Sequence, residues 1–257
     1  MVANPPHANR NGPERVAEPA REQALRAVEA GKSAAGARWP AGSQPSCQRL
    51  PTARLTSRFP IVSARLDSAP YHSADDYLRR ERRAESKSEY VNGYIYAMAG
   101  GSLAHNRITA NLHRLIANAL HQRHCEVFTS DMKVRIDRAN CFRYPDASGL
   151  CGPIELHDDV GDAYCIPQFI IEVLSPSTEA LDRGEKFHLY RFLDSLREYI
   201  LVRQDRVEVE IFRKEEDGRW NSVQYNELSD EFDLRSVGVR LSLSQIYERV
   251  IPPAPAP

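Results

Sequence analysis

Two hydrophobic periods alternate along the chain, and each predicts a different kind of element. After Gly100-Gly101-Ser102, apolar residues recur at steps of three and four, which predicts an amphipathic helix. Its apolar stripe consists of Ile108, Leu112, Leu115, Ile116 and Ala119. Ser73, with Asp76 three residues later, has the pattern of a helix N-cap, and we expect a short helix through Ala84. Further helices are predicted over residues 178–193 and 243–250.

A period of two, or a short continuous apolar run, predicts the strands. Residues 89–98 are predicted to form a hairpin, because Asn92-Gly93 is a strong turn signal between two apolar segments. The other predicted strands cover residues 127–136, 141–146, 169–174, 198–202, 207–212 and 220–225. Because helices and strands are interspersed, we expect a mixed α/β domain.

The N-terminal quarter of the chain differs from the rest. Residues 1–66 are rich in Ala, Pro, Arg, Gly and Ser and show no sustained hydrophobic period. Such a segment buries too little apolar surface to offset its ordering entropy, so we expect a disordered extension. An upstream translation start is a second explanation for these residues. The ordered domain is expected over residues 67–251, followed by a Pro-rich tail over 252–257.

Composition narrows the classes of function. The formal net charge is −1 over 257 residues, so DNA binding would need a local basic patch, for which the run at residues 79–83 is a candidate. Such charge runs are usually solvated faces. We expect no membrane span and no secretory signal, since no long apolar run is present. Five cysteines without a CxxC pair predict reduced thiols in a cytoplasmic protein.

One acid stands where the pattern predicts a buried strand. Glu172 interrupts the apolar run over residues 167–174, and a carboxylate there costs free energy unless a partner compensates it. Asp146 follows another predicted strand, so the two carboxylates could converge and bind Mg²⁺ or Mn²⁺. The alternatives are that Glu172 pairs with backbone amides or an arginine, and that Asp146 caps a turn after Pro145.

The spacing of these acids resembles a known pattern. Pro145-Asp146 followed by Glu172-Val173-Leu174 resembles the split motif of the PD-(D/E)XK nuclease superfamily. More closely, the chain resembles the Uma-two restriction endonuclease family, a domain of unknown function within that superfamily. The segments that carry the resemblance are residues 88–93, 104–108, 144–146, 171–178, 182–186 with Tyr190, and 198–202.

The resemblance implies a restriction-endonuclease-like fold, in which helices flank a mixed central sheet of about four strands. It implies a Mg²⁺-dependent endonuclease that hydrolyses phosphodiester bonds in DNA, with DNA as partner and a homodimer for double-strand cutting. Residue by residue, Asp146 and Glu172 match the metal-binding acids and Glu89 matches a third acid near the first helix. Lys186 matches a family lysine that would position or activate the attacking water.

Two departures from the superfamily pattern qualify this prediction. Leu174 occupies the position of the usual lysine, so catalysis depends on Lys186 reaching the acids from the next helix. This departure favours an alternative, a catalytically inactive DNA-binding or regulatory module of the same fold. After Asp146 the chain reads Ala-Ser-Gly-Leu-Cys, which we expect to be a weak strand. His105 stands at a helix start, where free amides attract anions; it is predicted to cap or pack its helix, with a phosphate contact as the alternative. Tyr190 is predicted to lie in the core.

Overall fold

A six-stranded mixed sheet forms the centre of this computed structural model, which describes residues 70–250. The strand order is β11 (Trp220–Tyr225), β10 (Val209–Lys214), β9 (Glu198–Arg203), β8 (Phe169–Leu174), β6 (Ala147–Cys151) and β3 (Cys125–Thr129). Strands β8 and β9 are parallel, and the other neighbours are antiparallel. The predicted extension over residues 1–66 and the tail over 252–257 lie outside the described residues.

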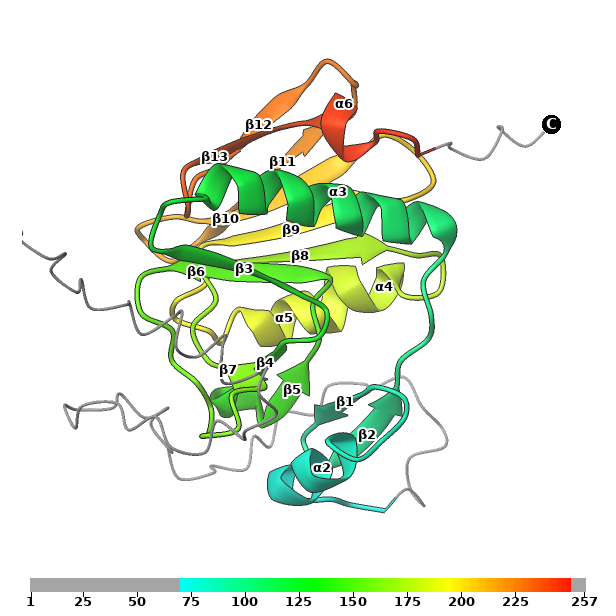
Figure 1. The fold of residues 1–257 in the computed structure, drawn as a ribbon, viewed down its shortest axis with the longest axis vertical. Helices are drawn as coiled ribbons and strands as arrows, with labels where there is room; N and C mark the ends of the chain where they lie inside the picture. The colour runs from blue at the N-terminus through cyan, green and yellow to red at the C-terminus, as the bar shows by residue number, and fades with distance from the viewer. Residues whose placement is uncertain (1–69, 251–257) are drawn as a thin grey trace, which may run out of the picture. The chain divides into compact units, whose positions relative to one another are not determined.

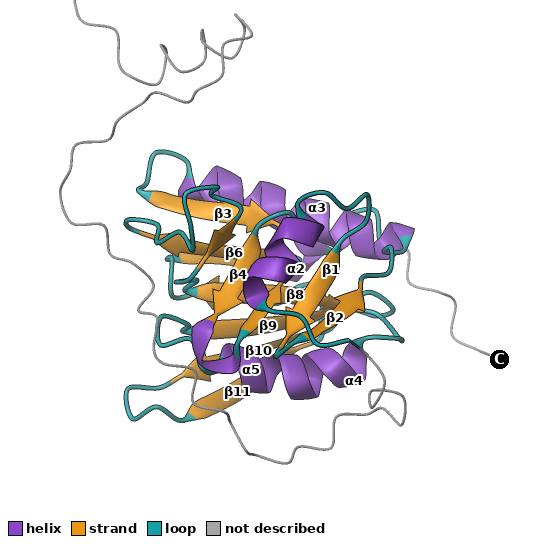
Figure 2. Cartoon of the chain, turned by 90° about the horizontal axis from the view of Figure 1, so that it is seen from below, coloured by secondary structure: helices purple, strands orange, loops and turns teal. Residues whose placement is uncertain are grey.

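A second sheet of five strands carries the N-terminal hairpin. Its order is β2 (Tyr94–Ala97), β1 (Ser88–Val91), β5 (Cys141–Arg143), β4 (Lys133–Ile136) and β7 (Ala163–Tyr164). Helix α2 (Ala74–Glu81) packs on β1 through Tyr77, and its N-cap Ser73 accepts a hydrogen bond from the Asp76 amide as predicted. The hairpin turn falls at Asn92-Gly93, where both residues have positive φ. Figure 2 shows this part of the molecule from below, with α2 in front of the strands.

Helices cover both faces of the six-stranded sheet (Figure 1). On one face lie α3 (Leu103–Leu120), α6 (Leu243–Ile246) and the small hairpin of β12 (Glu231–Leu234) and β13 (Val239–Ser242). On the other face lies one helical stretch, which comprises α4 (Glu179–Leu181), a π-helical turn (Asp182–Lys186) and α5 (Phe187–Tyr190). The sheet is therefore the middle layer of an α/β domain, as predicted.

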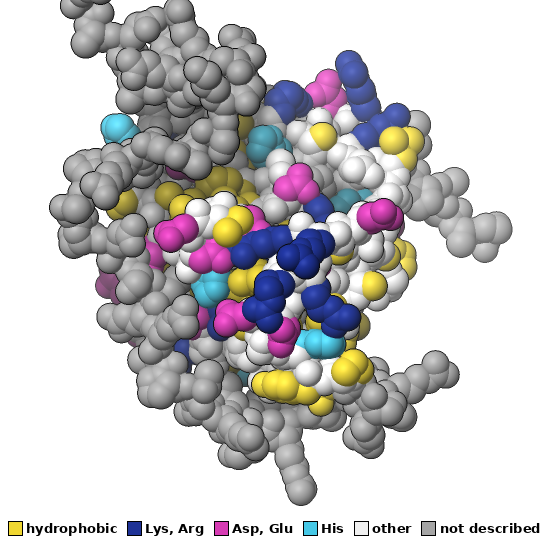
Figure 3. Space-filling model, turned by 60° about the horizontal axis from the view of Figure 1, so that its bottom comes forward, with side chains coloured by type: hydrophobic (Ala, Val, Ile, Leu, Met, Phe, Trp, Pro, Cys, Tyr) yellow, Lys and Arg dark blue, Asp and Glu magenta, His cyan; other side chains and the backbone are white. Residues whose placement is uncertain are grey.

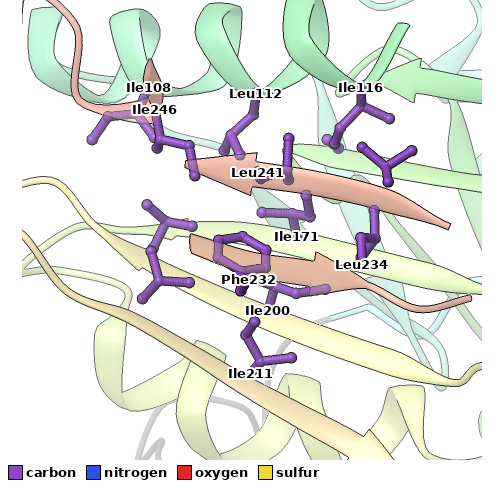
Figure 4. Close-up of a cluster of buried hydrophobic side chains, with 14 of the residues drawn as sticks. Ile108, Leu112, Ile116, Ile171, Ile200, Ile211, Phe232, Leu234, Leu241 and Ile246 are labelled. Atoms are coloured by element: carbon purple, nitrogen blue, oxygen red, sulfur yellow. The ribbon is translucent and has the colours of Figure 1, made fainter. Parts of the chain in front are cut away.

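The main core lies between α3 and the sheet. Ile108, Leu112 and Ile116 of α3 are completely buried against strand residues such as Ile171 and Ile200 (Figure 4). Each such side chain contributes about 1.5–3 kcal/mol when it leaves water. Because side chains alternate along β8, Ile171 and Val173 belong to this core, and Ile170 and Leu174 belong to the core on the opposite face. Glu172 therefore faces the α4–α5 stretch.

Several predicted boundaries were wrong. Residues 127–136 form two strands, β3 and β4, which belong to different sheets and are separated by a turn at Thr129–Met132. The predicted strand over 141–146 ends at Arg143, and the Ala-Ser-Gly-Leu-Cys segment expected to be weak is β6, in the sheet interior. The glycine in this strand, Gly149, has a structural reason. A methyl group there would clash with the Glu126 carbonyl oxygen and lie 2.8 Å from the Phe169 ring. The short strands β7, β12 and β13 were not predicted.

The expectation that the cysteines are reduced thiols is also wrong for Cys125, Cys151 and Cys165, which are disulfide-bonded. Cys125 and Cys151 stand directly opposite each other in the β3–β6 ladder, and they form a disulfide. The sequence separation of 26 residues hid this pairing, because only the strand register brings the two together. Cys141 is buried and free. Within residues 70–250, no helix has the length and apolar character needed to cross a membrane.

Candidate active site

Strands β6 and β8 bring the two predicted metal-binding acids together. Ala147 pairs with Ile171 in the antiparallel ladder, which places Asp146 beside Glu172 one residue further along. The Val173 amide donates a hydrogen bond of 2.7 Å to Asp146 Oδ2. Glu172 is 3% exposed, whereas the Asp146 side chain is 18% exposed. The pair thus has one buried carboxylate and one that reaches solvent.

The helical stretch under the sheet brings a cation to Glu172. Lys186 Nζ lies 3.3 Å from Glu172 Oε1 and 2.9 Å from Asp182 Oδ1. The Tyr190 hydroxyl donates a hydrogen bond of 3.1 Å to the same Glu172 oxygen. Asp182 and Lys186 begin and end the π-helical turn, a widened turn of the kind that often occurs at functional sites. A lysine from the next helix therefore lies beside Glu172, whereas position 174 carries a leucine.

Three buried carboxylates, Glu172, Asp182 and Glu89, lie within 4.0 Å of Lys186 Nζ and dominate the local electrostatics. Burial raises the pKa of Glu172, and the negative charges of Asp182 and Asp146 raise it further against the opposing effect of Lys186. Burial alone lowers the pKa of Lys186, but the adjacent carboxylates outweigh it and hold the pKa above its usual value. Lys186 is therefore a permanent cation, whereas Glu172 needs a proton or a further cation.

Glu89, the predicted third acid, lies at the edge of this cluster. Its Oε1 is 4.0 Å from Lys186 Nζ. Both of its oxygens accept hydrogen bonds, Oε2 from Arg143 at 2.5 Å and Oε1 from the Tyr144 amide at 3.2 Å. Burial alone raises the pKa of Glu89, but the Arg143 guanidinium outweighs this effect and lowers it. The structure thus places Glu89 in an ion pair beside the other three predicted residues.

The donor set fits one small divalent cation. Four carboxylates (Glu89, Asp146, Glu172, Asp182) and two cations (Arg143, Lys186) leave a surplus of two negative charges when all are ionised. Among residues 70–250, the hydrogen bonds to the acid pair end on Asp146 Oδ2 and Glu172 Oε1, which leaves Oδ1 and Oε2 for a ligand. The described residues contain no group of three or more His, Cys, Asp or Glu side chains arranged to hold a metal. Two carboxylates suffice for Mg²⁺, which retains several waters.

A protein-family model matches most of the described residues. The model of the Uma2 (Uma-two) family, described as "Putative restriction endonuclease", matches residues 74–244. The chain belongs to the Uma2 family. Its match covers both central acids, the helical stretch with Lys186 and the hairpin with Glu89.

Two Synechocystis proteins are similar to this Uma2 chain over most of its described part. "Uncharacterized protein slr1290" is 40% identical over 182 residues, which cover 70% of this chain and 94% of the relative. "Uncharacterized protein sll1609" is 38% identical over 148 residues, which cover 58% of this chain and 84% of the relative. A solved structure, that of a putative nuclease belonging to DUF820 from Anabaena variabilis, has a TM-score of 0.58 and 19% identity. It covers 70% of this chain and 99% of that protein, and shows that the fold is shared.

Sequence reasoning missed two residues of this Uma2 site. Arg143 is 2% exposed and holds Glu89 and Glu185, with a distance of 2.9 Å to Glu185 Oε1. The sequence did contain a signal for Arg143, because a charged side chain inside an apolar strand costs free energy, as it does for Glu172. His105 was predicted to cap or pack its helix, whereas its ring Nε2 lies 3.2 Å from Asp146 Oδ2. Tyr190 lies in the core as predicted, and its hydroxyl also binds Glu172.

Proposed function

We propose that this Uma2 protein is a Mg²⁺- or Mn²⁺-dependent endonuclease that hydrolyses phosphodiester bonds in DNA. The observation that supports the proposal most strongly is the meeting of Asp146, Glu172 and Lys186 from two strands and a helix that are separate in sequence. The surplus of negative charge at this point has no structural use of its own, because it destabilises the fold unless a cation is present.

Asp146 and Glu172 are the residues that would hold the metal. When bound, the ion would polarise the phosphate and lower the pKa of a bound water. Lys186 stays protonated because carboxylates surround it, so its role is that of a fixed positive charge. It would orient the attacking water or stabilise charge on the phosphate, and a second group must accept the proton. Glu89 would keep Arg143 and Lys186 in place.

A basic surface on α2 is the proposed contact for the DNA backbone. Lys and Arg side chains gather over this helix on the face seen in Figure 3. Its surface arginines are Arg79, Arg80, Arg82 and Arg83. Arg82 is bound to Asp158 and Asp162 at 2.6 and 2.7 Å, and Arg79 is paired with Asp76, so the phosphate contact would rest on Arg80 and Arg83. Binding through such a patch should weaken steeply as salt rises. We also propose a homodimer, since one site per chain cuts one strand at a time.

Cleavage assays with charge-removing variants test the proposal. Purified protein is incubated with plasmid or single-stranded DNA in Mg²⁺ or Mn²⁺, alongside Asp146→Asn, Glu172→Gln and, as a matched control, Asp194→Asn. Asp194 is 91% exposed and lies outside the site. We expect wild type and Asp194→Asn to cut, and the two site variants to lose about a hundredfold or more of the rate. Equal cleavage by all four would mean that a contaminant cuts the DNA.

A second candidate function is a non-cleaving DNA-binding or regulatory module. The observation that favours it is Leu174, which is 3% exposed and packs in the core where the superfamily lysine is expected. In that case the protein would bind DNA in a salt-sensitive way without cutting it in either metal.

A further inference from the structure

The beginning of α3 holds His105 in a fixed place beside Asp146. Ser102 is the N-cap of this helix, and its hydroxyl accepts a hydrogen bond of 3.1 Å from the His105 amide. The imidazole Nε2 then lies 3.2 Å from Asp146 Oδ2, and the His105 side chain is only 19% exposed. The same Asp146 oxygen accepts the Val173 amide hydrogen bond at 2.7 Å. Two groups from different elements therefore bind one oxygen of this carboxylate.

Gly101 provides the space that the imidazole occupies. A methyl group on Gly101 would lie 2.8 Å from His105 Nδ1 and 3.1 Å from its Cγ. Gly101 does not have positive φ, so its backbone conformation is open to alanine and only the ring excludes the methyl group. The neighbouring Gly100 has nothing within 4 Å of such a methyl group. The Gly-Gly-Ser segment therefore has distinct tasks: Gly101 leaves room for the ring, and Ser102 fixes its backbone.

We infer that His105 is a positioning residue for Asp146: with the Val173 amide it fixes the carboxylate through Oδ2 and so leaves Oδ1 to bind the cation. The role rests on the proposed function, because it presumes that Asp146 binds a metal. In this arrangement Nε2 carries the proton and donates it to the hydrogen bond, and Nδ1 faces Gly101. Partners of this kind orient metal ligands, and their loss typically weakens metal affinity about 10- to 100-fold.

A calorimetric titration of the full chain with Mn²⁺ tests this role. We expect His105→Ala to weaken Mn²⁺ binding about 10- to 100-fold. His105→Gln should recover most of the affinity, because its amide N–H can replace the Nε2–H donor. A merely structural loss at this position would not be rescued by one hydrogen-bond donor of the right reach. Thermal unfolding without metal checks that each variant is folded.

The two adjacent glycines provide a second, independent pair of variants. Gly101→Ala should displace the ring and reproduce the loss of affinity seen in His105→Ala, whereas Gly100→Ala should bind as wild type does. If the wild type binds Mn²⁺, Asp146→Asn abolishes binding, and His105→Ala and Gly101→Ala keep the wild-type affinity, then the role of His105 is refuted and the proposed function is not. Equal losses in Gly100→Ala and Gly101→Ala would also refute the role of His105. Absence of Mn²⁺ binding by the wild type would refute the proposed function and this role with it.

Discussion

Replacing Arg143 with methionine should destabilise the fold by about 3 kcal/mol or more, because it leaves a buried carboxylate without its main partner. The Arg143 and Glu89 side chains are 2% and 7% exposed, and 2.5 Å separates them. Breaking a buried pair of this kind typically costs about 3–5 kcal/mol. We expect a cost near the lower end of this range, because Glu89 retains the hydrogen bond from the Tyr144 amide and the charge of Lys186 at 4.0 Å. The contact with Glu185 adds little, because that side chain is 40% exposed.

Urea unfolding followed by tryptophan fluorescence and circular dichroism measures this cost. The double variant Glu89→Gln/Arg143→Met removes both charges and should recover much of the loss, so the two substitutions should be strongly non-additive. Arg138→Met is the matched control, because Arg138 is 54% exposed and lies 3.9 Å from an exposed aspartate. It should change stability by less than about 0.5 kcal/mol. A cost below about 1 kcal/mol for Arg143→Met, or additive losses in the double variant, would refute the account of this pair.

Three further outcomes follow from other contacts. The hydrogen bond from Arg82 lowers the pKa of Asp162 below its usual range, so this ion pair stabilises the fold above about pH 4 and its contribution is lost as pH falls. Asp162→Asn should therefore make the free energy of urea unfolding less dependent on pH in the acidic range. The Cys125–Cys151 disulfide links residues 26 positions apart, and its reduction should lower the free energy of unfolding by roughly 3 kcal/mol. A melting temperature that reductant leaves unchanged would contradict this. Gly149→Ala should cost about 1–3 kcal/mol in the same unfolding assay, because the neighbouring backbone has no room for a methyl group.

Sequence patterns predicted the elements whose side chains all serve one structural role. The apolar run at β8 and most of the α3 stripe were predicted correctly, because burial alone selects those residues; Ala119, however, is exposed, and Leu120 is buried instead. The pattern failed at β6. Gly149 is needed there because the backbone of Glu126 lies too close for a side chain, and this closeness exists only in the folded sheet. The pattern predicted the helix over 178–193, which the structure has over residues 179–190, but it did not predict the π-helical turn inside that stretch. Local periodicity does not encode either feature.

The candidate site was predictable to a similar extent. Glu172 stood out from its energetic cost and Asp146 from its place after a predicted strand. The resemblance added Glu89 and Lys186, and the structure places all four residues within one cluster. Which partner each acid takes was not predictable. Glu89 pairs with Arg143 because β1 and β5 are neighbours, a pairing of residues more than 50 positions apart. The contact between His105 and Asp146 likewise requires the placement of α3 over the sheet.

The central claim is that Asp146 and Glu172 together bind a divalent cation. Anomalous X-ray scattering from crystals soaked in Mn²⁺ tests it most directly. The account predicts one ion per chain, bound by Asp146 Oδ1 and Glu172 Oε2, with waters completing its coordination. An ion held elsewhere, or no anomalous peak at this pair at saturating Mn²⁺, would contradict the claim.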